Sequence, residues 1–159
     1  MKLILAVIFL VIVGCATPYK TGVGSGKGYF ETRLSDNHYV VSFQGNDATN
    51  DKKVYDYALL RAAEIGVELG FDVMVVQGVE STATTSNATY SVPVYNPPAD
   101  MINGVGTWSA STSSVSSIEP GYRLNVLYFN GEPSGKFISD TIFEPTQTLE
   151  RLRREYELN

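Results

Sequence analysis

The amino-acid sequence predicts an α+β fold: a β-hairpin, one long amphipathic helix, three or four mostly antiparallel strands and a short carboxy-terminal helix. Two alternating stretches flank a turn-forming trio near residue 36, and a helical apolar stripe follows over 51–69. Strand-like segments then fill most of the remaining chain. We therefore expect residues 29–159 to form a single α+β domain.

The predicted hairpin consists of Tyr29 to Leu34 and His38 to Gln44, joined by Ser35-Asp36-Asn37. Serine, aspartate and asparagine favour turns because their short side chains hydrogen-bond to nearby backbone. In the second strand, tyrosine, valine and phenylalanine occupy alternate positions and so share one face. We expect that face to lie in the core.

The predicted long helix begins near Thr49 or Asn50, either of which can cap it, and ends before Gly70. Apolar residues recur along it at intervals of three and four, which is the pattern of a helix with one buried face. This stripe consists of Val54, Ala58, Ala62, Ile65 and Leu69.

Later segments predict the rest of the sheet. Phe71 to Val79 is apolar on both faces, which is typical of a central strand. Further strands are expected at Glu80 to Val94, Tyr122 to Asn130 and, along one edge, Lys136 to Phe143, and a charged helix is expected from Pro145. Between them, about residues 95–121 predict a long Ser/Thr/Gly-rich loop, either mobile or a frayed hairpin, that contains Trp108.

The first 15 residues have the organisation of an export signal. Met1-Lys2 is positive, Leu3 to Val13 is an apolar run of 11 residues, and small Gly14 precedes Cys15. A membrane-spanning helix needs about 20 apolar residues. We therefore expect residues 1–14 to be a signal peptide that is removed.

Ile12-Val13-Gly14-Cys15 resembles the lipobox of bacterial lipoproteins. In that class a diacylglycerol is attached to the cysteine thiol, and the resemblance implies that Cys15 is the lipid attachment residue. Cys15 is the only cysteine, so it has no intramolecular disulfide partner. Ala16 follows in place of an aspartate, which by resemblance implies the outer membrane, with the domain facing the periplasm. The alternative is an ordinary signal peptide with a cysteine nearby by chance.

After Cys15 the chain is rich in Thr, Gly, Pro, Ser and Lys, and we predict that residues 15–28 are the lipidated cysteine and a flexible tether. The alternate glycines here are not a phosphate-binding loop. The first glycine of that motif would fall on Thr21, and its closing Ser or Thr position is Gly28.

The net negative charge argues against two kinds of partner. Without residues 1–14 the chain has 145 residues, with 11 Lys and Arg against 17 Asp and Glu, a net charge of −6. Phosphate repulsion then argues against nucleic acid, and the same balance argues against a polybasic grip on anionic lipid.

Several further pieces resemble a small family of uncharacterised Gram-negative outer-envelope lipoproteins, over roughly residues 12–80. The matching pieces are Cys15-Ala16-Thr17-Pro18-Tyr19, Gly28-Tyr29 with Glu31-Thr32, Val41-Ser42-Phe43 with Gly45-Asn46, and Arg61-Ala62-Ala63-Glu64. That family has no assigned biochemical activity, so the resemblance implies an anchor and a compact α+β domain and no mechanism. The segment from about Thr82 to Ser117 departs from its pattern.

The sequence contains little that indicates catalysis. His38 is the only histidine, with no nucleophile and acid spaced around it, and we interpret it as structural. Glu64 and Glu68 could be paired carboxylates, but we interpret them as a solvated helix face, with Arg61 paired to Glu64. We expect no metal and no cofactor.

The remaining candidates are aromatic and basic side chains. Trp108 and the tyrosines at 90, 95 and 122 border the predicted loop, and Arg151, Arg153 and Arg154 alternate with glutamates in the last helix. We therefore expect a membrane-anchored, non-catalytic interaction or structural module with an envelope protein partner. The alternatives are a ligand-binding protein that uses the loop around Trp108 and, more distantly, an envelope hydrolase.

Overall fold

The computed structural model describes residues 16–24, 26–96, 107–133 and 141–158, and divides the chain into two compact units. The core unit comprises the chain up to Thr84 and from Glu119 onward, and the ribbon unit comprises Thr85–Ile118. Cys15 and the predicted signal peptide lie outside the described residues. The α+β class is confirmed, with helices and antiparallel sheets in the part that is described.

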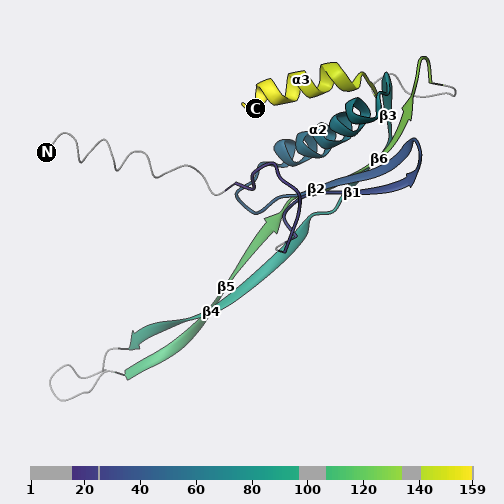
Figure 1. Ribbon diagram of the computed structural model, residues 1–159. Helices are drawn as coiled ribbons and strands as arrows, with labels where there is room; N and C mark the ends of the chain where they lie inside the picture. Colours follow the sequence, from purple (N-terminus) through teal and green to yellow (C-terminus); the bar gives the residue numbers. More distant parts are fainter. Residues whose placement is uncertain (1–15, 25, 97–106, 134–140, 159) are drawn as a thin grey trace, which may run out of the picture. The chain divides into compact units, whose positions relative to one another are not determined.

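The core unit is built on an antiparallel sheet with the strand order β1-β2-β6-β3-β7. The strands are β1 (Gly28–Ser35), β2 (His38–Gln44), β3 (Val73–Ser81), β6 (Gly121–Phe129) and β7 (Ile142–Phe143). Helix α2 (Asp51–Leu69) packs against β2 and β6, and α3 (Pro145–Glu155) packs against α2 (Figure 1). The predicted hairpin is thus confirmed as β1 and β2.

Helix α2 follows the sequence pattern closely. The Asn50 side chain accepts a hydrogen bond from the Lys52 backbone N–H at 2.8 Å, and Gly70 ends the helix with a φ of 74°. The predicted stripe is buried from Val54 to Ile65, but Leu69 is 49% exposed. Leu69 is the last residue of the helix.

The core lies between the sheet and α2. The β2 face predicted to be buried is confirmed, since Tyr39, Val41 and Phe43 are all buried. Tyr128 of β6 is fully buried opposite α2, where its hydroxyl donates a 2.8 Å hydrogen bond to the Ala62 carbonyl oxygen. Its ring stacks on Phe71 and meets Tyr39 edge-on.

Of the two alternatives predicted for about residues 95–121, the mobile loop is wrong for residues 107–119 and the hairpin is closer to the structure. Residues 107–119 form strand β5 (Thr107–Glu119), which pairs with β4 (Thr84–Asn96) in a two-stranded sheet, the ribbon unit, and residues 97–106 lie outside the described part. Threonine and valine favour extended backbone even without an apolar face to bury. Because no such face exists here, apolar periodicity could not reveal the strand.

Two other boundaries differ from the sequence prediction. The expected strand from Glu80 to Val94 is divided between β3 and β4, with a break at residues 82–83. Of the expected edge strand from Lys136 to Phe143, only Ile142–Phe143 is described as strand β7, since 134–140 lie outside the described residues.

Burial of tyrosine predicts a loss of stability in alkali. Burial raises the pKa of Tyr128 above its ordinary value of 10.0, and burial together with a hydrogen bond to Asp56 raises the pKa of Tyr156 to about 12. Above about pH 10 an unfolded tyrosine loses its proton while folded Tyr128 keeps it, so the free energy of unfolding should fall by about 1.4 kcal/mol per pH unit for Tyr128. Urea unfolding between pH 8 and 11 measures this slope, and Tyr128→Phe should flatten it. An equal slope in the wild-type protein and in Tyr128→Phe would show that Tyr128 does not cause the loss of stability.

Candidate functional site

The segment predicted to be a flexible tether is instead packed on the core unit. We call residues 16–24 and 26–28 the amino-terminal segment. The Thr17 backbone N–H donates to Thr49 Oγ1 at 2.9 Å and to Asn46 Oδ1 at 3.3 Å, and Thr17 is only 5% exposed. The tether prediction is therefore wrong at Thr17, and the contacts of Tyr19 and Gly22 extend this result along the segment as far as Gly22.

Tyr19 is the main side-chain attachment of this segment. Its ring centroid lies 5.1 Å from that of Tyr29 and 5.2 Å from that of Tyr57, and its hydroxyl donates to Glu64 Oε2 at 2.5 Å. Burial, followed by the hydrogen bond to Glu64, holds the pKa of Tyr19 above its usual range. A phenol in such a site stays protonated and keeps donating to the carboxylate.

Backbone pairing attaches the rest of the amino-terminal segment to β1. The Gly22 N–H donates to the Tyr29 carbonyl oxygen at 2.8 Å, and the Tyr29 N–H donates to the Lys20 carbonyl oxygen at 2.9 Å. Gly28 has a φ of +118°, and a Cβ atom there would lie 2.4 Å from the Lys20 oxygen. The glycine that indicates a linker from composition is thus required for close backbone contact.

Arg61 lies at the centre of an ion-pair cluster that joins α2 to β1. It donates to Glu31 at 2.5 Å, to Glu64 at 3.0 Å and to Glu68 at 2.9 Å. Its guanidinium also lies 5.2 Å from the Tyr29 ring centroid. Burial opposes the charge of Arg61, but the hydrogen bonds to these glutamates outweigh it and hold its pKa above the ordinary value.

This cluster confirms the predicted pair of Arg61 with Glu64 and corrects the interpretation of Glu64 as part of a solvated face. The Glu64 side chain is 11% exposed and also accepts from Arg153 of α3 at 3.1 Å. Each carboxylate of the cluster is occupied by a cationic partner. The arrangement stabilises the joint between α2, α3 and β1.

His38, the predicted structural histidine, lies half-buried on β2 with its Nε2 atom 2.5 Å from Asn125 Oδ1 of β6. The adjacent strands place an amide beside the ring. In the described part of the chain, no group of three or more His, Cys, Asp or Glu side chains could hold a metal ion.

Two of the three arginines of α3 form ion pairs, and the third, Arg154, is exposed. Arg153 bonds to Glu64, and Arg151 lies 3.5 Å from Glu155 in the same helix. Lys52 reaches Glu155 from α2 at 2.7 Å. The alternation of charge predicted from the sequence therefore produces contacts between the two helices.

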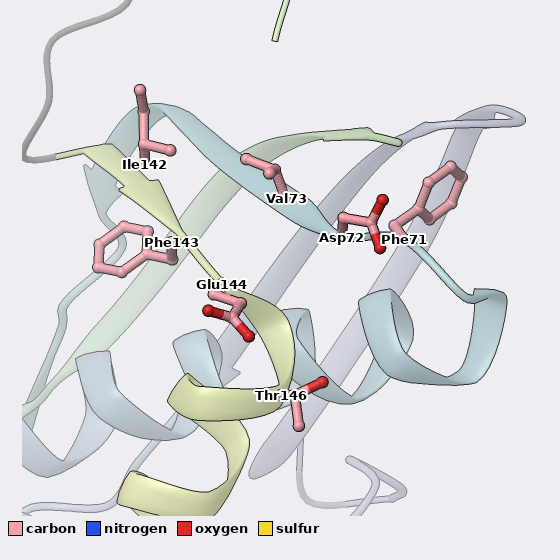
Figure 2. Close-up of a pocket in the computed structure, with 7 residues that line it drawn as sticks. All are labelled: Phe71, Asp72, Val73, Ile142, Phe143, Glu144 and Thr146. Carbon is pink, nitrogen blue, oxygen red and sulfur yellow. The ribbon is translucent and has the colours of Figure 1, made fainter. Parts of the chain in front are cut away.

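A cavity of about 430 Å³ lies where β3 and β7 meet the start of α3. Figure 2 shows Phe71, Ile142 and Phe143 around it, with the carboxylates of Asp72 and Glu144 as its acidic groups. Asp72 accepts a hydrogen bond from the Gly131 N–H at 3.1 Å. No histidine, lysine or arginine is among the residues described as lining it.

The ribbon unit differs in character from the core unit. Strand β4 contains no charged residue, and β5 contains only Glu119, its last residue. Large apolar side chains are exposed on both strands, namely Val92, Val94, Val115 and Ile118. Within the described residues each strand has one partner strand and therefore one edge of unpaired backbone.

Trp108 lies within β5 and not in a loop, and the structure does not describe its side chain. Residues 107–119, which were expected to be part of a loop that offers aromatic side chains to a ligand, form a strand instead. Tyr122, at the start of β6, packs edge-on against Tyr55 and donates to Asp51 at 2.7 Å. Its hydroxyl is used within the core unit.

None of the helices in the described residues is long and apolar enough to cross a membrane. Comparison with family models, characterised proteins and solved structures finds no match to this chain.

Proposed function

We propose that this chain is a lipid-anchored envelope protein, held at the periplasmic face of the outer membrane through Cys15, that serves as a non-catalytic interaction module. The observation that carries the interaction role is the ribbon unit, with its uncharged strands, exposed valines and unpaired edges. The lipobox-like Ile12-Val13-Gly14-Cys15 supports the anchor.

An isolated two-stranded ribbon is marginally stable in water, and a third strand improves it. Natural proteins usually protect exposed edges with charges or proline; β4 contains Pro93 and no charge, and β5 contains neither before Glu119. The partner that fits is therefore an extended segment of another envelope protein, which adds a strand through backbone hydrogen bonds. Ser116 and Asn87, bonded across the ribbon at 2.7 Å, help keep the two strands in register for it.

Photocrosslinking in cells, combined with a proline scan of β5, tests the interaction role. A photoreactive residue in place of Val115 should crosslink in cells to one defined envelope protein, whereas the same residue in place of Asp36, on the exposed β1–β2 turn, should not. Proline is introduced singly at successive β5 positions, so that each variant removes one N–H and the N–H groups alternate between the two edges; only prolines whose N–H would face the unpaired edge should abolish the crosslink. Crosslinking that is unaffected by every proline would exclude strand addition.

Mass spectrometry tests the anchor directly. The amino-terminal peptide of the mature protein should begin at Cys15 and carry a diacylglycerol and an additional acyl chain. Labelled palmitate should enter the protein and should be absent from Cys15→Ala. A mature chain with an unmodified Cys15 thiol would refute the lipid attachment.

A further inference from the structure

We infer that the core unit lies directly on the bilayer, with the β2–α2 connection (residues 45–50) against the lipid headgroups and no tether between them. This inference rests on the proposed lipid at Cys15. It adds the surface of the protein that faces the membrane.

The first argument is covalent reach. Thr17 is two residues after Cys15, and a chain extends by at most about 3.6 Å per residue. The Cα atom of Cys15 therefore lies within about 7 Å of that of Thr17, wherever Cys15 itself is placed. Because Thr17 is buried against Asn46 and Thr49, acyl chains on Cys15 must enter the bilayer beside the 45–50 connection.

The second argument is that the amino-terminal segment is held at several points and does not act as a linker. A flexible coil of about 12 residues would separate the lipid from the domain by about 20 Å on average. Here Thr17 is bonded to the 45–50 connection, Tyr19 packs between two tyrosine rings, and Gly22 pairs with Tyr29. All three must break before the segment can extend.

The third argument is the chemistry of the surface itself. Asp47, Ala48 and Asn50 are exposed in the 45–50 connection, and Asp51 follows at the start of α2. These side chains are small or polar, which suits contact with headgroups and not insertion into hydrocarbon. Two aspartates disfavour an anionic surface, so the bilayer that fits is zwitterionic.

The two ends of β2 provide a near and a far position relative to the proposed membrane surface. The strand runs for seven residues from the β1–β2 turn to Gln44, which is about 20 Å at the usual rise. Figure 1 shows the β1–β2 turn at the opposite end of the hairpin from the amino-terminal segment. Asp36 in that turn is fully exposed, so a probe there reports the far end of the core unit.

The experiment places single fluorophores on the lipidated protein. Ala48→Cys and Asp36→Cys are labelled separately, since lipid on Cys15 leaves the introduced thiol as the only free one. Each protein is reconstituted in phosphatidylcholine vesicles that carry a contact-range nitroxide quencher on the headgroup. The label at position 48 should be quenched at least several-fold more strongly than the label at position 36.

A matched control restores the missing tether. A Gly/Ser insertion of about 20 residues between Ala16 and Thr17 keeps the amino-terminal segment docked but separates it from the lipid. Quenching at position 48 should then fall to the value at position 36. Equal quenching at both positions without the insertion, in protein shown by mass spectrometry to be lipidated, overturns the inference and leaves the anchor intact. Absence of lipid refutes the anchor instead.

A substitution that releases the amino-terminal segment from the core unit tests the same inference. Gly28→Val places a Cβ atom 2.4 Å from the Lys20 oxygen at a φ of +118° and should release the amino-terminal segment, including the hydrogen bonds of Thr17 to Asn46 and Thr49. Protease cleavage at Lys20 and Lys27 should become several-fold faster, and the difference in quenching between positions 48 and 36 should shrink. Circular dichroism confirms that the sheet and helices persist. Faster cleavage with an unchanged quenching difference would count against a role of the docked segment in placing the domain.

Discussion

Replacing Tyr128 with alanine is expected to lower the free energy of unfolding by about 3–5 kcal/mol, the usual cost of truncating a buried aromatic side chain. The residue is completely buried between the sheet and α2. Its removal leaves a cavity beside Phe71 and Tyr39, whose rings contact it at centroid distances of 5.4 Å and 5.7 Å. It also removes the hydroxyl that binds the Ala62 carbonyl oxygen.

Urea unfolding of the protein measures this loss of stability, with Tyr128→Phe as the matched control. Phenylalanine keeps the ring and loses only the 2.8 Å hydrogen bond, so it should cost about 1 kcal/mol. A cost for alanine no greater than that for phenylalanine would show that ring packing at this position contributes little.

Replacing Arg61 with methionine is expected to lower the free energy of unfolding by about 2–3 kcal/mol, because it leaves the weakly exposed Glu64 carboxylate with one cation fewer. Methionine keeps much of the side-chain volume, so lost packing is a minor part of the change. Glu31 and Glu68 lose the same partner but reach water more readily, which keeps the cost below that of a fully buried pair.

The matched control is Glu68→Gln, which removes one charge from the exposed rim of the same cluster. The Glu68 side chain is 58% exposed, so its ion pair should contribute less than about 0.5 kcal/mol. If Arg61→Met and Glu68→Gln lower the free energy of unfolding equally in urea titrations, the Glu64 carboxylate is solvated, as the helical spacing alone predicts.

Helix α2 and the β1–β2 hairpin could be predicted from sequence because their signals are local. The Asn50 cap, the left-handed Gly70 and the three- and four-residue spacing of the stripe all act within a few residues. The alternation in β2 specifies its buried face in the same way. By contrast, the exposure of Leu69 depends on which distant residues reach the last turn of the helix, and the spacing of apolar residues carries no information about that.

The candidate site could be predicted only in part. Arg61 and Glu64 are three residues apart in one helix, so their pairing follows from helical geometry. Glu31 and Arg153 join that cluster from 30 and 89 residues away in the chain. For β5 the sequence predicts only a mobile loop or a frayed hairpin, because its serines and threonines have no apolar periodicity to decide between them.

By itself, the sequence determined the α+β class, the long helix with its caps, and the amino-terminal pattern on which the proposed anchor depends. Only the tertiary structure decided that the segment from Thr17 to Gly22, together with Lys27 and Gly28, is docked. Their attachments join Thr17 to Asn46 and Tyr19 to Glu64, across separations of 29 and 45 residues. A segment rich in Gly and Thr has the composition of a linker, but it becomes ordered where a distant surface satisfies its backbone and buries its tyrosine.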